Sequence, residues 1–514
     1  MSFEDYSSQL LRYPEMGFSL DVSRMDIPEN FRTKMETKVA KSFSDMEALE
    51  GGAIANPDEE RMVGHYWLRK PELAPSEELR KQITEPLADL KSFSKDVIAG
   101  RVVTSAGQKF TTLLVVGIGG SALGPQFIYE ALATTEAMRT EFLDNTDPAG
   151  IDRTLGRIGE GLATTLVVVI SKSGGTPETR NGMLEVQAAF QRKGFDFAGN
   201  AVAITGEGSK LFQFAESEGF LKIFPMEDWV GGRTSVMSTV GLVPMALQGI
   251  DVDAVLAGAA AMDEKTRNQT ANAAMEMALA WHSEGNGKGE KDMVVLPYKD
   301  SLLLLSKYLQ QLVMESLGKE KDLAGEVVNQ GLAVYGNKGS TDQHAYVQQL
   351  RDGVHNFFAV FIEVREGRKG DSIEVEPGVA SADFLQGFLR GTRSALYGNG
   401  RRSLTISIPE VTAETVGQLI ALFERAVSFY ASLVNINAYH QPGVEAGKKA
   451  AGVFLETLKK VTEGLCSEPV TAQGLAEKLG EDSEDVYHCL THLASSGKAK
   501  LALGETPKDD EFCV

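Results

Sequence analysis

Lys307, Gln311 and Glu315 are polar residues spaced four apart in the apolar segment 301–319, SLLLLSKYLQQLVMESLGK. Residues four apart lie on one face of a helix, so the spacing predicts a row with an ammonium, an amide and a carboxylate. A carboxylate can abstract a proton and return it, so such a row could take part in proton transfer. For this helix alone, the alternative is an ordinary solvated polar face with an exposed Glu315.

A loop of small residues, Ser171–Thr176, reads Ser-Lys-Ser-Gly-Gly-Thr and lies between a strand-like and a helix-like stretch. Its hydroxyls and backbone N–H groups can converge on an oxyanion, and a helix N-terminus favours negative charge. Lys172 would add positive charge, so this loop is a candidate phosphate cradle. The loop matches neither the Walker pattern nor GxGxxG, and an ordinary strand-to-helix turn is the alternative.

A second loop, Gly117–Ser121, begins like a dinucleotide-binding loop but departs from that pattern. We interpret it as a place where the backbone approaches a small ligand closely, with Ser121 as a donor. Arg233 follows two glycines at the start of an apolar helix. Its guanidinium could face developing oxyanion charge, although a surface arginine in a turn is the alternative.

His344, in the loop 339–344, and Lys448, at the start of a predicted helix, are single residues with ordinary alternatives as structural or surface groups. His488 and His492 are spaced i, i+4 on a helix of the tail, as a metal-binding pair could be. The chain has no HExxH pattern and no obvious acidic third ligand, so we expect no metal site.

Repeated strand, small-residue loop and helix units must position these side chains. Short apolar runs at Thr112–Val116, Leu166–Ile170 and Ala201–Thr205 each end in a loop of small residues, and Met293–Pro297 starts a second set. This pattern predicts an α/β fold with parallel sheets and helices on both faces. Ligands of such sheets bind at the carboxyl ends of the strands, where the candidate loops lie. In the second set, the helix 301–319 has leucines at helical spacing, which predicts a buried face.

Changes in the pattern of helix-like and strand-like stretches divide the chain into four parts. One boundary lies in or near the glycine-rich loop 284–289. We expect an N-terminal helical segment (1–100), two α/β subdomains (101–284 and 285–465) and a C-terminal extension (466–514). The extension reads as helix, helix, strand and resembles a small winged-helix module. Because it carries more acidic than basic residues, we expect it to pack against protein rather than DNA.

The composition excludes several classes of function. The 514 residues include 71 acidic and 51 basic ones, and the net charge of −20 argues against binding of nucleic acid or an anionic membrane by the whole chain. The N-terminus lacks the pattern of a signal peptide, and no apolar run is long enough to span a bilayer. The three cysteines suggest neither a disulfide framework nor a zinc site, so a reducing cytoplasm is expected.

Six motifs, in order along the chain, resemble the glucose-6-phosphate isomerase family of the sugar-isomerase (SIS) domain proteins. They are VVGIGGSALGP (115–125), ISKSGGTPET (170–179), GGRTSVMS (231–238), QLVMESLGK (311–319), GSTDQHAYVQQL (339–350) and NAYHQPGVEAGKKAAG (437–452). The resemblance covers roughly residues 110–455. It implies two SIS subdomains, each a three-layer sandwich with a parallel sheet, and a homodimer in which His344 crosses to the partner's site.

The resemblance also implies roles for individual residues. Glu315 matches the base that moves a proton between sugar C2 and C1, and Arg233 matches the cation that stabilises the enediolate. His344 matches the residue that opens the sugar ring, Lys448 the residue that assists at the ring oxygen, and Glu178 the carboxylate that orients the histidine. The implied substrate-binding residues are Gly120, Ser121, Ser171, Lys172, Ser173, Thr176, Gln311 and Gln441.

The residue types suit this chemistry without a cofactor. A carboxylate can shuttle the proton, a histidine titrates near neutral pH, and an arginine supplies a charge that it does not lose. Two alternatives stay open. One is a dual enzyme that also isomerises mannose 6-phosphate, and the other is a regulator that senses a sugar phosphate and binds DNA through its tail. The set Glu315, His344 and Lys448 argues against the regulator, because a sensor needs no proton-transfer groups.

Overall fold

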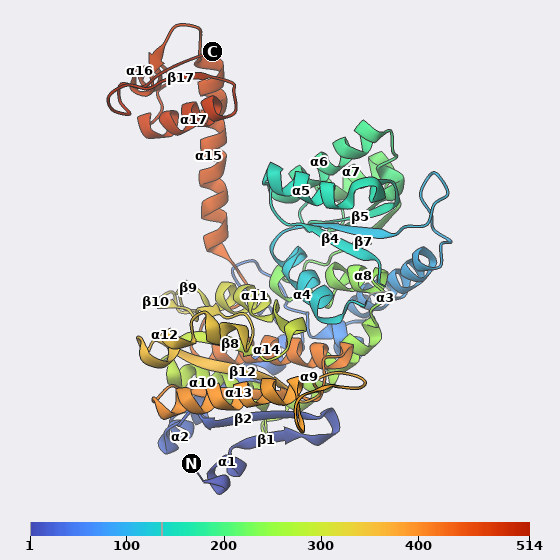
Figure 1. Ribbon diagram of the computed structural model, residues 1–514, viewed down its shortest axis with the longest axis vertical. Coiled ribbons are helices and arrows are strands. Elements are labelled where there is room, and N and C mark those ends of the chain that lie inside the picture. The colour runs from blue at the N-terminus through green and yellow to red at the C-terminus, as the bar shows by residue number, and fades with distance from the viewer. Residues whose placement is uncertain (1, 135–136) are drawn as a thin grey trace. The chain divides into compact units, whose positions relative to one another are not determined.

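In the computed structural model, which describes residues 2–134 and 137–514, the first half of the chain forms a five-stranded parallel sheet (Figure 1). Its order is β4-β3-β5-β6-β7, and all neighbouring pairs are parallel. The strands are β3 (Thr112–Val116), β4 (Arg139–Leu143), β5 (Thr165–Ile170), β6 (Ala201–Thr205) and β7 (Lys222–Pro225). The central strands β3, β5 and β6 are buried throughout. The prediction of strands from these apolar runs is confirmed.

Helices cover both faces of this sheet (Figure 1). One layer is α5 (Pro148–Ile158), α6 (Pro177–Lys193) and α7 (Lys210–Glu218), and the other is α3 (Glu77–Ile98), α4 (Leu123–Leu132) and α8 (Thr239–Leu247). Successive strand residues point to opposite faces, so Leu114 and Val116 pack with the first layer and Leu113 and Val115 with the second. The carboxyl ends of the parallel strands share one edge, which therefore carries the loops 117–121 and 171–176.

The second sheet has six strands in the order β1-β2-β15-β12-β8-β11. They are β1 (Leu10–Tyr13), β2 (Phe18–Arg24), β8 (Asp292–Pro297), β11 (Val334–Tyr335), β12 (Phe357–Val364) and β15 (Ser403–Ile408). Four of them run parallel, as predicted, but β1 and β2 form an antiparallel hairpin that pairs with β15. The parallel sheet predicted from residues 285–465 is therefore present, and an antiparallel hairpin is added at its edge. The N-terminal segment, expected to be helical, supplies this hairpin.

Helices also cover both faces of the second sheet. Helices α12 (Val347–Asp352) and α13 (Ser381–Gly398) pack on one face, and the nearly fully buried α14 (Ala413–Leu433) belongs to the core on the other. α14 contacts α9 (Val252–Arg267), α10 (Ala273–Glu284) and α2 (Glu29–Glu50). A Cβ on Gly258 of α9 would lie 2.0 Å from the carbonyl oxygen of Glu414, so only glycine allows this approach.

The shorter elements complete the description. They are α1 (Phe3–Ser8), β9 (Lys319–Lys321), β10 (Val327–Gln330), β13 (Glu374–Glu376) and β14 (Val379–Ala380). Among helices of the described ranges, none has both the length and the hydropathy that crossing a membrane requires.

The segment 301–319 is helical but is not one regular α-helix. A 3-10 turn, η8 (Asp300–Leu302), precedes α11 (Leu305–Leu309), and Gln310–Glu315 then form a π-helix, η9. The predicted apolar stripe of leucines is confirmed, since Leu302, Leu305, Leu309 and Leu312 are all at most 1% exposed. The predicted α-helical register from Lys307 to Glu315 is wrong, because π-helical hydrogen bonds span one residue more than α-helical ones.

A fully buried ionic network joins the helices beneath the site. Arg69, on the 3-10 turn η2 (Trp67–Arg69), pairs with Asp263 of α9 at 2.5 Å and with Glu424 of α14. Arg425 of α14 pairs with the other oxygen of Asp263 at 3.1 Å. Burial opposes ionisation of Asp263, but the two guanidinium groups outweigh it and lower its pKa to about 2. Arg69 also lies 3.6 Å from the sulfur of Met237, so the network supports the segment that follows Arg233.

Residues 441–514 form a compact unit separate from residues 1–440. It contains α15 (Pro442–Gly464), α16 (Ala472–Leu479) and α17 (Ser483–Ser495), with antiparallel strands β16 (Val470–Thr471), β17 (Lys500–Ala502) and β18 (Glu511–Cys513). Asp482 caps α17 with its side chain, as the sequence predicts. The unit 441–514 has an apolar core of its own, which includes Val461, Leu490 and Phe512. Within this unit α15 packs with α16 and α17.

Candidate active site

Three segments that are distant in the sequence meet at the carboxyl edge of the first sheet. The loop after β3 contacts η9, since a Cβ on Gly119 would lie 3.1 Å from the amide nitrogen of Gln311. The same loop touches the turn η7 (Gly232–Thr234), because a Cβ on Gly120 would lie 1.9 Å from the carbonyl oxygen of Gly232. Only glycine fits at that position. The structure thus brings together Gly120, Gln311 and the turn that carries Arg233.

Arg233 and Glu315 face each other across this junction. The Nε atom of Arg233 lies 3.8 Å from Oε2 of Glu315, and their side chains are 5% and 22% exposed. Arg233 also donates to the hydroxyl of Ser316 at 3.4 Å and to the main-chain oxygen of His440 at 3.2 Å. Burial lowers the pKa of Arg233, and Glu315 opposes the shift. An arginine remains protonated at neutral pH even so, which leaves a fixed positive charge beside a carboxylate.

The carboxylate of Glu315 has one unused acceptor. Its Oε2 atom is buried and accepts no hydrogen bond from any residue in the described part of the chain. Buried polar atoms are nearly always paired in folded proteins, and exceptions often have a catalytic role. This oxygen is therefore suited to accept a proton from a bound molecule. The alternative of an ordinary solvated glutamate does not fit its burial.

Lys319 lies next to this pair and was not singled out from the sequence. Its side chain is buried and its Nζ donates to the main-chain oxygens of Glu315 and Ser316, both at 2.8 Å. Burial and the charge of Arg233 lower the pKa of Lys319 to about 7, although Glu315 and Asp58 act in the opposite direction. The only signal in the sequence was its place at the end of the segment 311–319.

The loop 171–176 is held in shape by hydrogen bonds to its own hydroxyl groups. The backbone N–H of Gly174 donates to the hydroxyl of Ser171 at 3.1 Å, and that of Gly175 donates to Ser173 at 3.2 Å. The hydroxyls of Ser171 and Thr176 lie 3.4 Å apart, and α6 begins directly after the loop with Glu178 in its first turn. Hydroxyls and a helix N-terminus are thus gathered at one point.

The ammonium of Lys172 is held by main-chain oxygens of a neighbouring segment. Its Nζ donates to the main-chain oxygens of Asp228 and Val230, at 2.9 and 3.1 Å. Burial lowers its pKa, and Asp228 opposes that shift. Lys172 therefore ties the loop 171–176 to the segment that leads to Arg233.

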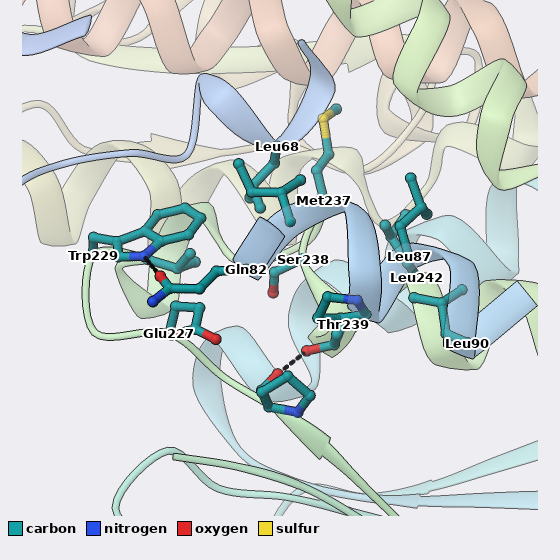
Figure 2. A pocket seen from close by; sticks show the side chains of 14 residues that line it. Leu68, Gln82, Leu87, Leu90, Glu227, Trp229, Met237, Ser238, Thr239 and Leu242 are labelled. Carbon is teal, nitrogen blue, oxygen red and sulfur yellow. Dashed lines mark hydrogen bonds between the residues drawn. The ribbon is translucent and has the colours of Figure 1, made fainter. Parts of the chain in front are cut away.

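The segment from Trp229 to Thr239 borders a small cavity, and a hydrogen bond holds each end of the segment (Figure 2). The indole N–H of Trp229 donates to Gln82 at 2.9 Å, and the hydroxyl of Thr239 donates to the main-chain oxygen of Pro225 at 2.6 Å. The cavity between them is about 30 Å³, room for about one water. This volume is too small for a sugar.

His344 lies on a firmly held loop and is exposed. The loop is the 3-10 turn η10 (Thr341–His344), in which the buried Asp342 accepts hydrogen bonds from the backbone of Asn337 at 2.9 Å and from Tyr346 at 2.5 Å. Among the described residues no hydrogen bond connects His344 with Glu178 or Glu315.

Lys448 and Gln441 belong to the unit 441–514. Gln441 is the residue before α15, and Lys448 lies on the exposed part of that helix. His488 and His492 lie on α17, and no group of three potential metal ligands occurs among the described residues.

Comparison with known proteins decides the family. The model of the phosphoglucose isomerase family matches residues 21–387 and 354–472. The chain belongs to the phosphoglucose isomerase family. A glucose-6-phosphate isomerase from Rippkaea orientalis is 60% identical over 512 residues, which cover 98% of this chain and 97% of the relative. One from Thermosynechococcus vestitus is 58% identical, with 99% of this chain and 98% of the relative covered.

Solved structures of similar proteins agree with this membership of the phosphoglucose isomerase family. A glucose-6-phosphate isomerase from Chlamydia trachomatis superposes with a TM-score of 0.79 at 26% identity, over 89% of this chain and 92% of the other. A hypothetical protein from Thermus thermophilus gives a TM-score of 0.72 at 29% identity, over 85% and 99% of the two chains. The α/β fold with two helix-flanked sheets is therefore shown by both structure and relationship.

Beside Lys319, sequence reasoning missed His440 and Asp58. Nδ1 of His440 lies 3.7 Å from a carboxylate oxygen of Asp58. Burial lowers the pKa of His440, and Asp58 opposes this shift. His440 directly precedes Gln441 in a motif that carries the resemblance, but only the contact of its main-chain oxygen with Arg233 shows its place in the site.

Proposed function

We propose that this chain interconverts glucose 6-phosphate and fructose 6-phosphate by proton transfer through a cis-enediolate. The observation that supports it most is the buried, unused Oε2 of Glu315, 3.8 Å from the guanidinium of Arg233. A base next to a fixed positive charge is what an aldose–ketose isomerase requires. Membership of the phosphoglucose isomerase family supports the choice of sugar.

In the proposed reaction, Glu315 removes the proton from C2 of the open-chain aldose. The electron pair of that C–H bond forms the C1–C2 double bond, and the C1 oxygen becomes negatively charged beside Arg233. The C2 hydroxyl proton then moves to the C1 oxygen, the electron pair on the C2 oxygen forms the new carbonyl, and Glu315 returns its proton to C1. The proton count balances, and no oxidant or reductant is consumed.

The phosphate group anchors the substrate away from the reacting carbons in this proposal. Ser121, Ser171, Ser173 and Thr176 supply hydroxyls, and Gly120 supplies backbone. Lys172 contributes positive charge while it holds the loop through its contacts with Asp228 and Val230. The amides of Gln311 and Gln441 contact the sugar. Binding energy from the phosphate can then hold C1 and C2 against Glu315.

Ring opening is assigned to His344, oriented by Glu178, and Lys448 assists at the ring oxygen. Because His344 is exposed and has no hydrogen bond with Glu315 among the described residues, we propose that the enzyme is a homodimer in which His344 enters the partner's site. The family resemblance of the motif around His344 supports this assignment. A cytoplasmic location suits a sugar-phosphate substrate and the three free cysteines.

We propose four parts for the chain: the N-terminal segment 1–100, SIS subdomains 101–284 and 285–465, and the extension 466–514. The N-terminal hairpin β1–β2 extends the sheet of the second subdomain. The extension packs against protein in this proposal and does not bind nucleic acid.

A coupled assay tests the function directly. Purified full-length protein should convert fructose 6-phosphate to glucose 6-phosphate, detected with a glucose-6-phosphate dehydrogenase and NADP. Mannose 6-phosphate serves as the comparison substrate, and turnover of it at a comparable rate would indicate the dual enzyme. A folded protein with no turnover of either glucose or fructose 6-phosphate would refute the proposal.

A further inference from the structure

Lys319 is a buried lysine directly after the end of the helical segment that carries Glu315. Gly318 already follows the last helical residue, and its N–H donates to the oxygen of Met314 at 2.8 Å. The chain then enters β9, so the oxygens of Glu315 and Ser316 have no partner further along a helix. Nζ of Lys319 takes that place with both hydrogen bonds at 2.8 Å. The ammonium thus holds the main chain of Glu315 itself.

The charges around Lys319 come from four segments. The charge of Arg233 on η7 lowers the pKa of Lys319, whereas Glu315 on η9 and Asp58, in the loop after residue 56, raise it. The charge of Lys319 in turn lowers the pKa of His440. Two cations, Arg233 and Lys319, therefore lie close to one catalytic carboxylate, with Asp58 as a second anion.

Burial of an ammonium is costly unless the charge is paired and hydrogen-bonded. Lys319 is 5% exposed and its pKa falls to about 7, mainly through burial. A glycine or a neutral donor could satisfy two carbonyl oxygens without this cost. The charge itself, beside the carboxylate of Glu315, is what the neutral alternatives lack.

We propose that Lys319 is a positioning residue for the proton transfer, which fixes the main chain of Glu315 and places a second positive charge near its carboxylate. This inference rests on the proposed isomerase function. The positive charge adds to the field of Arg233 at the developing enediolate.

Three substitutions at Lys319 separate the two roles. Lys319→Met removes both the charge and the hydrogen bonds, Lys319→Gln keeps a donor without charge, and Lys319→Arg keeps both. Lys321→Met is the matched control, because Lys321 lies two residues further along β9 and is exposed. For each variant, kcat and KM for fructose 6-phosphate are measured from about pH 5.5 to pH 9, and thermal unfolding checks the fold.

We expect kcat of Lys319→Met and Lys319→Gln to fall about 10- to 100-fold, with KM within about threefold of wild type. Lys319→Arg should recover kcat to within about threefold of wild type, because it keeps both the positive charge and the hydrogen-bond donors. Lys321→Met should match wild type throughout.

A kcat of Lys319→Gln within about threefold of wild type, or a kcat of Lys319→Arg no higher than that of Lys319→Gln, would overturn the inference. If Lys319→Met does not fold, Lys319→Gln is compared with Lys319→Arg by the same criteria. Both of these side chains can donate to the carbonyl oxygens. An inactive wild-type protein would instead refute the proposed function, so the two failures are distinguishable.

Discussion

Replacement of Glu315 by glutamine tests the assignment of the base most directly. The side chain keeps its volume and can still lie 3.8 Å from Arg233, but Oε2 is replaced by a group that cannot take up a proton. General-base catalysis contributes about 10²–10⁴-fold. At about 1.4 kcal/mol per factor of ten, the barrier should rise by roughly 3–5 kcal/mol.

Binding of the sugar phosphate should be almost unaffected by Glu315→Gln. The proposed phosphate contacts come from the loop 171–176, which is built on β5 and α6 and not on η9. The Kd for fructose 6-phosphate, measured by calorimetry, should therefore stay within about threefold of wild type. The fold should also persist, because Arg233 keeps its hydrogen bonds to Ser316 and His440.

Hydrogen exchange reports the proton transfer itself. In D₂O, wild-type protein should introduce deuterium at C1 of fructose 6-phosphate, followed by NMR, and Glu315→Gln should do so at least 100-fold more slowly. Glu320→Gln, an exposed carboxylate on β9, is the control and should exchange like wild type. Exchange by Glu315→Gln within tenfold of wild type, or a loss of affinity as large as the loss of rate, would refute Glu315 as the base.

Three further predictions concern other groups. Arg233→Met should lower kcat by at least about 100-fold in the coupled assay with KM changed less, because the enediolate loses its fixed cation. His344→Asn and Glu315→Gln are each expected to be inactive, but a refolded mixture should regain activity if His344 enters the partner's site. Asp263→Asn should lower the free energy of unfolding in urea by about 3–5 kcal/mol, since it leaves Arg69 and Arg425 buried without their shared anion. Because Asp263 is stabilising above its unfolded pKa near 4 and loses this effect as pH falls through about 2, the difference should shrink only in strong acid.

Each of these predictions has a contrary outcome. Full activity of Arg233→Met would remove the guanidinium from the mechanism. A mixture no more active than its components would indicate that His344 acts within its own chain or not at all. An Asp263→Asn protein as stable as wild type at neutral pH would show that the buried network is not stabilised by that carboxylate.

The sequence predicted the first sheet well for a physical reason. Central parallel strands are covered on both faces, so they are short, continuous apolar runs that end in glycine-rich loops. Thr112–Val116 and Ala201–Thr205 were located to the residue. The hairpin β1–β2 was missed because its pairing partner β15 lies almost 400 residues later in the chain. No local pattern carries information about that pairing.

The candidate site was predicted by residue type but not by its contacts. Loops after β3 and β5 had to lie at one edge once the strands were parallel, so Ser121 and Ser171 were both expected at that edge. The contacts of Arg233 with Ser316 and His440 and the burial of Lys319 depend on how η7, η9 and β9 pack. Such tertiary contacts leave no periodic signal in the sequence.

The π-helix η9 explains why a row of three polar residues has only two members at the site. A regular α-helix would align Lys307, Gln311 and Glu315. Because η9 begins at Gln310, its longer hydrogen-bonded turns shift Gln311 and Glu315 relative to Lys307, which lies in α11 and is exposed. Single π-turns inside helices occur frequently at functional sites. Here the irregular turn directs Gln311 toward Gly119 and Glu315 toward Arg233, while the leucines before it stay buried.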